Sequence, residues 1–296
     1  MALIDSWPRV LSLILILSVC LLVAGCGLDK APMIDTKGPV AQAQRDLLFT
    51  GLFLMLIVAI PVFLLAGFFV WRYRANGGTG KYTPDWAYSG KIDAIIWLIP
   101  AIIVAILGYL LWTTTHRLDP YKNIGAADNA IVVQAIAQDW KWLFLYPEYG
   151  IATVNELAFP NERTLALRIT SDTVMNSFII PALGGQIYAM AGMTSRLHLV
   201  ADEPGQFTGR NTMYSGDGFA DQHFQAYAMS NADFEAWLQK VRQTGQSLDA
   251  SAYETLAKPS TAHQVEYYAD YEQDLFGRIL AKYEQRPGGH SMMQDQ

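Results

Sequence analysis

Cysteine is almost absent from this chain. Its 296 residues contain two cysteines, Cys20 and Cys26, and none follows between Gly27 and Gln296. A disulfide-stapled scaffold, a zinc ribbon and a cysteine-ligated iron–sulfur cluster all need several cysteines within the fold. The sequence therefore excludes these three classes for everything beyond Cys26.

Charge is also scarce. Charged residues make up 16 % of the chain and hydrophobic residues 52 %, whereas a soluble domain averages about 25 % charged residues. We therefore expect part of the chain to lie in lipid. The formal net charge is −6 and no long basic run occurs, which argues against nucleic acid as a partner.

Residues 1–25 have the pattern of an export signal. Arg9 precedes a short apolar run that ends in the small residues before Cys26, and this order is typical of a signal peptide. The run is shorter than the roughly 20 residues of a membrane span. The tetrapeptide Val23-Ala24-Gly25-Cys26 resembles a bacterial lipobox, which implies cleavage before Cys26 and its lipidation. The alternative is an uncleaved anchor or a buried thiol. Residues 26–45 are then an exported N-terminal segment.

Two further apolar runs predict membrane helices at 46–71 and 93–115. Neither 47–71 nor 94–115 contains a charged residue. A helix of about 25 residues reaches about 37 Å, enough for a hydrocarbon core of about 30 Å. Tryptophans near the ends of both runs are typical of the membrane interface. The alternative is two buried helices of a soluble core.

The charge of the connecting loop gives the orientation. Residues 72–92 contain four basic side chains and one acid, whereas the part from His116 onward has 13 basic and 21 acidic side chains. Basic loops stay in the cytoplasm. We therefore expect the loop inside and both the N-terminus and the C-terminal part outside, which agrees with lipidation at Cys26.

The part outside the membrane is expected to begin with a β-rich domain, 116–230, and to continue with a helical extension, 231–286. Short runs rich in β-branched and aromatic residues, separated by turn signals, are typical of a sandwich or barrel. The predicted strands are 131–137, 143–146, 164–170, 174–180 and 196–200. A helix is predicted from Ala232 to about Gln243, and a less regular helical stretch from Tyr267 to Tyr283. The last residues, 287–296, are expected to be disordered.

This arrangement resembles subunit II of the haem–copper respiratory oxidases. The local sequences that carry the resemblance are Gln138-Asp139-Trp140-Lys141-Trp142, Asp172-Thr173-Val174-Met175-Asn176-Ser177-Phe178, Met190-Ala191-Gly192-Met193 and Ser89-Gly90-Lys91-Ile92-Asp93. The resemblance covers nearly the whole chain and is strongest to the bo-type ubiquinol oxidase branch. It implies a membrane-anchored α+β protein with a lipidated N-terminus, a two-helix transmembrane hairpin, an exported cupredoxin-like β-sandwich and C-terminal helices.

The copper site of the related cytochrome c oxidases is missing from this sequence. That family holds a binuclear copper centre with a histidine and a Cys-x3-Cys-x3-His-x2-Met motif. On this chain the first histidine falls on Asn176, the cysteines on Gly218 and Gln222, the second histidine on Ala226 and the methionine on Met229. Thiolates bridge such a centre, and no cysteine follows Cys26. We therefore expect vestigial positions, with neither metal nor catalytic residues in this chain.

The resemblance implies an accessory subunit of a proton-pumping ubiquinol oxidase in a bacterial inner membrane. The haems and copper are then expected in partner subunit I, which oxidises ubiquinol and reduces oxygen to water, alongside further small membrane subunits. Cytochrome c is not an expected partner. The alternatives are a free membrane lipoprotein that binds another molecule and a copper-bearing cytochrome c oxidase subunit II. The absence of cysteine after Cys26 disfavours the second.

Asp93 begins the second predicted span. An acid in the first turn of a helix is favoured by the helix dipole, with a contribution of roughly 0.3–1 kcal/mol. The resemblance adds a second interpretation, because an acid at this place in the family lies at the entrance of one proton pathway of subunit I. The family residue is usually glutamate, which is one methylene longer. Both interpretations stay open for Asp93.

Overall fold

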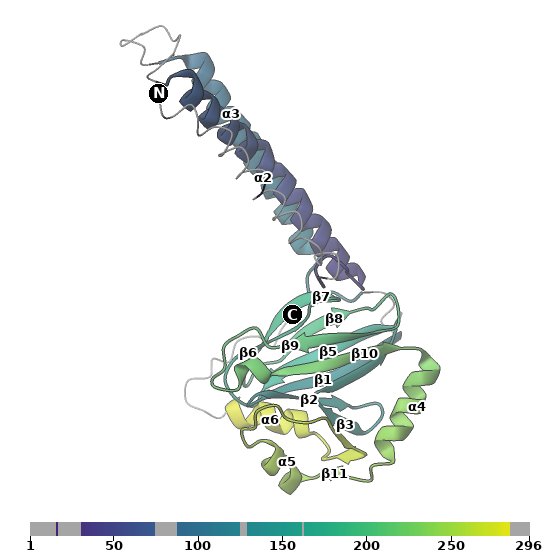
Figure 1. The fold of residues 1–296 in the computed structure, drawn as a ribbon. Coiled ribbons are helices and arrows are strands. Elements are labelled where there is room, and N and C mark those ends of the chain that lie inside the picture. Colours follow the sequence, from purple (N-terminus) through teal and green to yellow (C-terminus); the bar gives the residue numbers. More distant parts are fainter. Residues whose placement is uncertain (1–15, 17–30, 75–87, 125–128, 162, 285–296) are drawn as a thin grey trace. The chain divides into compact units, whose positions relative to one another are not determined.

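The computed structural model describes residues 16, 31–74, 88–124, 129–161 and 163–284. The chain divides into two compact units, 43–122 and 1–42 together with 123–296 (Figure 1). Each unit is described by itself. The predictions for Cys26 and for the tail 287–296 fall outside the described residues.

Two long apolar helices make up the first unit. α2 (Pro39–Arg72) has 34 residues and α3 (Gly90–Arg117) has 28, so each is long enough to cross a hydrocarbon core of about 30 Å. Most of their large apolar side chains are exposed within this chain. A helix that is apolar all round is typical of a membrane span. By length and composition, both helices are candidate spans.

Both helices extend beyond the predicted apolar spans. α2 begins at Pro39 rather than near residue 46, and α3 begins at Gly90 rather than 93. Proline suits the first helical position because its missing N–H would have no partner there. Pro61 and Pro100 lie inside the helices, which continue through both. The limits of the membrane-embedded parts, 46–71 and 93–115, stay predictions.

The second unit is a sandwich of two β-sheets. The strand orders are β12-β3-β2-β1-β5-β8 and β4-β10-β9-β6-β7 (Figure 1). The first sheet contains β1 (Ala130–Gln138), β2 (Lys141–Tyr146), β3 (Ile151–Val154), β5 (Thr164–Ser171), β8 (Ser195–Leu199) and β12 (Glu266–Tyr268). The second contains β4 (Glu156–Pro160), β6 (Asn176–Ile180), β7 (Gly184–Ala189), β9 (Gly205–Arg210) and β10 (His223–Met229).

Aromatic rings fill the space between the two sheets. Trp142 meets Phe178 edge-on with ring centroids 5.2 Å apart, and Phe144 meets Phe224 at 5.0 Å. All four side chains are buried. Edge-to-face pairs add to the stabilisation that burial of the rings already gives. This core fixes the two sheets against each other and so positions the loops at their ends.

The segment before the first long helix is bound to the sandwich. The backbone N–H of Lys37 donates to the carbonyl of Ala182 at 2.8 Å, and the N–H of Asp202 donates to the carbonyl of Lys37 at 2.9 Å. Between these contacts a β-carbon on Gly38 would lie 2.2 Å from the carbonyl oxygen of Val200. Only glycine therefore fits at position 38.

The strand predictions were correct for β1, β2, β5, β6 and β8, although β6 begins at Asn176 rather than Val174. The sequence missed β3, β4, β7, β9 and β10. β7 and β9 contain two glycines each, and Phe207 is the one large apolar residue of β9, so neither has the repeated large apolar side chains that identify a strand in a sequence. Their pairing partners, not their own residue preferences, make them strands.

The C-terminal extension is not helical throughout, which corrects the prediction for 231–286. α4 (Asn231–Arg242) is present, with the hydroxyl of Ser230 accepting the N–H of Asp233 as an N-cap. The remaining elements are β11 (Ser247–Leu248), α5 (Ala250–Leu256), β12, β13 (Asp270–Tyr271) and α6 (Leu275–Glu284). Tyr267 and Tyr268 lie in β12 because this segment pairs with β3 at the sheet edge. The predicted helix from Tyr267 to Tyr283 is therefore correct only for its second half.

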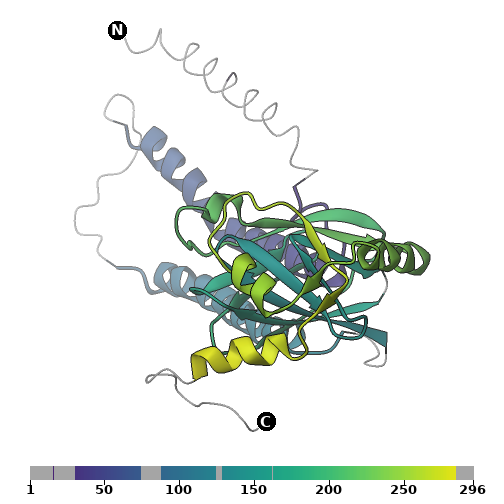
Figure 2. The ribbon, with the colours of Figure 1, turned by 90° about the horizontal axis from the view of Figure 1, so that it is seen from below.

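The extension covers the outer face of the first sheet with a second apolar core. Leu256, Phe276 and Ile279 from the extension pack in one cluster with Ile136 and Leu143 from the sheet. Figure 2 shows α6, in yellow, at this side of the sandwich. Residues that face outward on β1 and β2 are buried for this reason.

Candidate functional site

The five positions at which the resemblance predicts vestigial copper ligands do not form one cluster. Asn176 is the first residue of β6, while Gly218 and Gln222 flank the short helix η3 (Phe219–Asp221). Ala226 and Met229 lie inside and at the end of β10. The first three lie in loops and strand ends on one side of the sandwich, and the last two belong to the sheet.

Asn211 connects Asn176 to Gln222. Its Nδ2 donates to Oδ1 of Asn176 at 2.7 Å and to Oε1 of Gln222 at 2.9 Å. Its Oδ1 accepts the backbone N–H of Ser177 at 2.8 Å and of Met213 at 2.9 Å. The three amide side chains are buried. Two predicted positions therefore meet through a residue that the sequence did not single out.

The outer atoms of this amide network also have partners. Nδ2 of Asn176 donates to the carbonyl of Val174 at 2.8 Å, and the hydroxyl of Ser215 donates to Oε1 of Gln222 at 3.0 Å. Nε2 of Gln222 donates to the carbonyl of Gln138 at 3.4 Å. A buried polar network whose members are satisfied holds its loops in a single arrangement.

Gly218 lies beneath the ring of Trp140. A β-carbon at position 218 would lie 2.3 Å from Cδ2 of Trp140, and Nε1 of Trp140 donates to the carbonyl of Ser215 at 3.1 Å. Trp140 has φ +64°, a backbone conformation that residues other than glycine seldom adopt. The indole therefore takes the space that a ligand side chain at 218 would need.

The placement of the second histidine on Ala226 needs correction. Ala226 pairs with Phe207 of β9 and Leu157 of β4 inside the sheet, whereas Gln222 reaches Asn176 through Asn211. The geometry favours Gln222 as the second histidine position. Counted with the same motif, the cysteine positions then become Tyr214 and Gly218, and the methionine position becomes Gln225. Met229 drops out of the set.

The side chains at these positions do not fit a thiolate copper centre. Neither the original nor the corrected placement contains a thiolate or an imidazole, which are the ligands such a centre requires. The buried amides are engaged with one another. Among the residues that the structure describes, no group of three or more histidine, cysteine, aspartate or glutamate side chains is placed to hold a metal ion.

The loop before Asn176 is anchored by a buried carboxylate. The side chain of Asp172 is 2 % exposed. Its Oδ1 accepts Nζ of Lys282 at 2.7 Å and its Oδ2 accepts the hydroxyl of Tyr253 at 2.6 Å. The hydroxyl of Tyr283 donates to the backbone carbonyl of Asp172 at 2.7 Å. Three residues of the extension therefore bind one residue of the loop.

The same contacts shift two pKa values. Burial raises the pKa of the Tyr253 hydroxyl, and the charge of Asp172 raises it further. For Lys282, burial alone would lower the pKa, but the hydrogen bond to Asp172 and its charge outweigh this and raise it. At neutral pH Tyr253 is neutral and donates its O–H to the Asp172 carboxylate, and Lys282 is charged and pairs with the same carboxylate.

Two further buried charges connect the sandwich to the extension. Oε1 of Glu156 accepts Nε1 of Trp237 at 2.7 Å and the hydroxyl of Tyr267 at 2.9 Å. Nζ of Lys141 donates to the carbonyl of Lys258 at 2.8 Å and to the hydroxyl of Ser260 at 2.7 Å. Burial lowers the pKa of Lys141. These contacts satisfy charges that would be costly if left alone in the fold.

Asp93 lies in the first turn of α3. Its backbone N–H donates to the carbonyl of Ser89 at 3.0 Å. No ion pair to its carboxylate occurs among the residues that the structure describes. The position fits both the helix-dipole and the proton-pathway interpretation.

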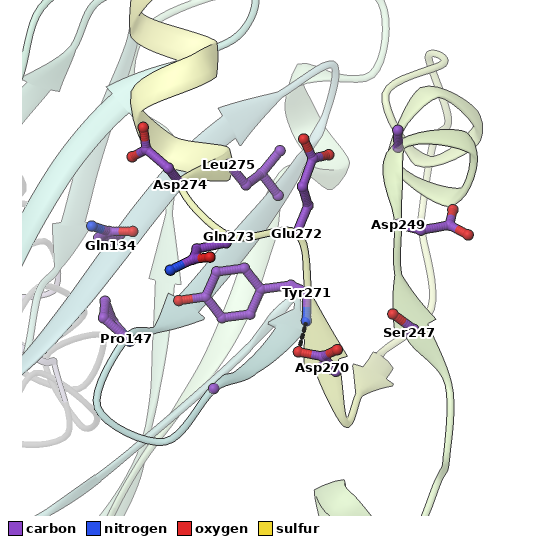
Figure 3. A pocket seen from close by; sticks show the side chains of 12 residues that line it. Gln134, Pro147, Ser247, Asp249, Asp270, Tyr271, Glu272, Gln273, Asp274 and Leu275 are labelled. Atoms are coloured by element: carbon purple, nitrogen blue, oxygen red, sulfur yellow. Dashed lines mark hydrogen bonds between the residues drawn. The ribbon is translucent and has the colours of Figure 1, made fainter.

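A separate cavity of about 810 Å³ lies between the first sheet and the extension (Figure 3). Gln134 lines it from the sheet, and the acids Asp249, Asp270, Glu272 and Asp274 line it from the extension. Glu272 is paired with Arg278 at 2.8 Å, and Asp249 caps α5. Two of the four acids therefore already have structural roles.

The comparisons with known proteins agree on one family. A family profile described as the COX Aromatic Rich Motif matches residues 242–286. Cytochrome bo(3) ubiquinol oxidase subunit 2 of Pseudomonas aeruginosa is 46 % identical over 90 % of this chain and 80 % of that protein. Ubiquinol oxidase subunit 2 of Acetobacter aceti is 47 % identical over 90 % of this chain and 86 % of its own length.

A solved structure has a more distant likeness. The periplasmic domain of subunit II of cytochrome oxidase from Bradyrhizobium japonicum is 20 % identical, with a TM-score of 0.38, and covers 38 % of this chain and 94 % of that one. The matches to the two sequence relatives cover most of this chain and most of each relative's own length. The chain therefore belongs to the family of ubiquinol oxidase subunit 2.

Proposed function

We propose that this chain is the accessory subunit 2 of a respiratory ubiquinol oxidase. The complex oxidises ubiquinol, reduces oxygen to water and pumps protons across the cell membrane. Family membership over 90 % of the chain supports this assignment. This subunit provides a membrane hairpin and a folded domain, and the reaction takes place in subunit I.

The amide network is the observation that carries the second part of the proposal, the absence of a redox centre in this subunit. Asn176 and Gln222 stand at two histidine positions of the copper motif and are bound to each other through Asn211. Amides in this arrangement cannot replace the thiolates and imidazoles of a binuclear copper site. Ubiquinol is lipid-soluble and reaches subunit I within the bilayer, so no copper relay outside the membrane is needed. The haems and copper are assigned to subunit I.

The test is purification of the intact complex through a tag on this chain. We expect a haem-bearing partner with many membrane spans, oxygen consumption with ubiquinol, and no oxidation of reduced cytochrome c. The spectrum should contain no purple or blue thiolate–copper band from this subunit. Purification without a haem protein would favour a free lipoprotein, and a thiolate–copper band would favour a cytochrome c oxidase subunit.

The proposed orientation in the membrane is that of a two-helix hairpin whose loop lies inside the cell. Residues 72–92 face the cytoplasm, and the sandwich with its extension lies in the periplasm. Cys26 becomes the first residue of the mature chain and carries acyl chains such as palmitate. Mass spectrometry of the purified subunit should find lipid on Cys26. The Cys26→Ser variant should lose the lipid but remain in the membrane. Each CH₂ of an acyl chain adds only about 0.8 kcal/mol to membrane binding, and the two spans bury far more apolar surface in the bilayer than the acyl chains do.

Asp93 is proposed as the entrance of a proton pathway into subunit I. An acid at a membrane edge collects protons from the cytoplasmic surface and passes them on through water. Its location in the first turn of α3 supports this role, and the corresponding prediction is given in the Discussion.

A further inference from the structure

One buried lysine holds a segment of the extension against the sandwich. Lys141, at the start of β2, is buried, and its Nζ donates to the carbonyl of Lys258 at 2.8 Å and to the hydroxyl of Ser260 at 2.7 Å. The same Nζ also donates to the carbonyl of Asp139 at 3.4 Å. No carboxylate forms an ion pair with Lys141 in the part of the chain that the structure describes. The contact between the sandwich and residues 258–263 therefore depends on neutral oxygen acceptors.

The hydroxyl of Ser260 lies between this lysine and a histidine. Its Oγ is 2.7 Å from Nζ of Lys141 and 2.9 Å from Nδ1 of His263. A hydroxyl has one hydrogen, and a charged lysine can only donate. The hydroxyl of Ser260 therefore accepts from Lys141 and donates its own hydrogen to Nδ1. Because Nδ1 acts as the acceptor, the neutral imidazole of His263 carries its proton on Nε2.

The other nitrogen of His263 faces a carboxylate of the extension. Nε2 lies 3.1 Å from Oε1 of Glu266, the first residue of β12, and Oε2 of Glu266 accepts the hydroxyl of Tyr268 at 2.5 Å. The side chain of Glu266 is 39 % exposed, so protons from solvent reach this end. Lys141, Ser260, His263 and Glu266 thus form a continuous row of polar contacts from the buried ammonium to the surface.

A second proton on His263 is incompatible with this arrangement. Nδ1 then becomes a donor, so the hydroxyl of Ser260 lies between two cationic donors and its own hydrogen has no acceptor in the row. The two like charges also repel each other. The contact with Glu266 responds in the opposite way, because a charged donor binds a carboxylate more strongly than a neutral one. Protonation therefore favours the contact within the extension over the contact with the sandwich.

We propose that Lys141, Ser260 and His263 form a proton-sensitive latch, which holds 258–263 against the sandwich while His263 is neutral and releases this segment when His263 is charged. Histidine suits such a switch because it changes charge between about pH 5 and about pH 8. The other titratable groups that face the latch are Glu266, on the histidine side and itself bonded to Tyr268, and Asp139, on the lysine side.

The lysine supplies the charge that opposes the histidine. Burial lowers the pKa of Lys141, and the charges of Asp139 and Glu266 raise it. Acid conditions that charge His263 also keep Lys141 charged, so the two cations meet at Ser260. Under the proposed function this domain lies on the side to which the complex pumps protons, where the latch would respond to them. The latch itself does not depend on that assignment, because all of its residues belong to this chain.

The experiment places a nitroxide spin label on the segment, in the full chain in detergent. Thr261 is exposed and is replaced by cysteine, while Cys20 and Cys26 are replaced by serine to leave one attachment site. We expect a restricted label at about pH 8 and a mobile label at about pH 5, on either side of the histidine range. The ratio of mobile to restricted label should rise at least about tenfold, the effect of losing one hydrogen bond to a charged group. The change should reverse when the pH is raised again.

His263→Asn separates protonation from loss of the contact. The amide oxygen of asparagine can accept the hydroxyl of Ser260 but takes up no proton, so the label should stay restricted at both pH values. Ser260→Ala removes the shared hydroxyl and should abolish the pH response. His223→Asn is the matched control, because it removes an exposed histidine of β10 that lies outside the latch. It should keep the full response.

Two results would overturn the latch directly: a label at position 261 whose mobility does not change with pH, or a full response in His263→Asn. A second label, on Gln239→Cys in α4, should report no change. An equal change there would mean that the whole extension loosens in acid, which also contradicts a local latch. None of these measurements needs a partner subunit, so their failure leaves the proposed function to its own test.

The tautomer of His263 gives an independent measurement. The chain has five histidines, so selective nitrogen-15 labelling gives few imidazole signals, and the signal lost in His263→Asn identifies this residue. At about pH 8 it should have the shifts of the tautomer with its proton on Nε2. A proton on Nδ1 would contradict the direction of the hydrogen bonds through Ser260 and with it the latch.

Discussion

The indole ring of Trp140 occupies the space in which a side chain at position 218 would begin. A β-carbon on Gly218 would lie 2.3 Å from Cδ2 and 2.5 Å from Cγ of that ring. The ring is itself held by its hydrogen bond to Ser215 and by an uncommon backbone conformation. Position 218 is therefore restricted to glycine by packing, in the loop where the resemblance to the copper-bearing oxidases predicts a ligand position.

Gly218→Ala should destabilise the sandwich by about 1–3 kcal/mol, the usual cost of overpacking a filled site. The measurement is denaturant unfolding of the full chain in detergent, followed by tryptophan fluorescence. Asp217→Ala, in the same loop, is the control and should have little effect. Equal stability of the Gly218→Ala variant and the unmodified chain would show that Trp140 moves aside freely.

Asn211→Ala should have a larger effect than the size of the removed side chain suggests. The variant leaves the amides of Asn176 and Gln222 and the backbone N–H of Ser177 without their shared partner. Each buried polar group left unpaired costs about 1–3 kcal/mol. Gln206→Ala is the control, because its amide bonds Gln225 at the surface. Similar unfolding midpoints for the two variants would contradict the importance of the network.

Much of the sandwich can be predicted from the sequence, because β1, β2 and β5 are short runs of mainly apolar residues, with β-branched or aromatic residues in each, between clear turns. β9 (Gly205–Arg210) cannot be recognised in this way. It is a strand because β10 pairs with it along six residues, and such long-range pairing leaves no local pattern. The helix predicted for Tyr267 and Tyr268 is wrong for the same reason, because these residues form a strand by pairing with β3.

The site was predictable only in part. The absence of cysteine after Cys26 is visible in the sequence, and the placement of the first histidine position on Asn176 stays a prediction. Asn211 gave no signal, because a lone asparagine after a strand is usually a turn residue. The register of the second histidine needed the structure, since only the contact between Asn176 and Asn211 shows that Gln222 faces the first position.

We expect alkaline pH to lower the free energy of unfolding of the domain that contains the extension. Burial raises the pKa of Tyr253 and Tyr267, and the neighbouring carboxylates of Asp172 and Glu156 raise both further. An unfolded tyrosine ionises near pH 10. Above that pH the folded state therefore binds more protons than the unfolded state, and the free energy of unfolding falls as pH rises. Lys141 has the opposite sign, because burial lowers its pKa.

The measurement is chemical unfolding of the full chain in detergent at about pH 8 and about pH 11, on either side of the ordinary tyrosine pKa. We expect a lower unfolding free energy at the higher pH. The tyrosinate absorbance of Tyr253 and Tyr267, taken as the difference between the unmodified chain and the double variant Tyr253→Phe with Tyr267→Phe, should appear only as the chain unfolds. The double variant should show a smaller fall in the unfolding free energy. A difference in tyrosinate absorbance between the two folded chains near pH 10 would contradict the raised pKa values of Tyr253 and Tyr267.

Asp93→Asn decides between the two interpretations of this acid. The substitution removes the charge but keeps the size of the side chain, and the helix dipole at the first turn of α3 is worth only roughly 0.3–1 kcal/mol. Assembly and haem content should therefore not change. If Asp93 feeds protons to subunit I, steady-state oxygen reduction with ubiquinol slows in Asp93→Asn and is retained in Asp93→Glu, which restores the acid with one more methylene. The measurement is oxygen consumption per haem in purified complex. Normal turnover in a fully assembled Asp93→Asn complex would leave the helix-dipole role as the whole account of this residue.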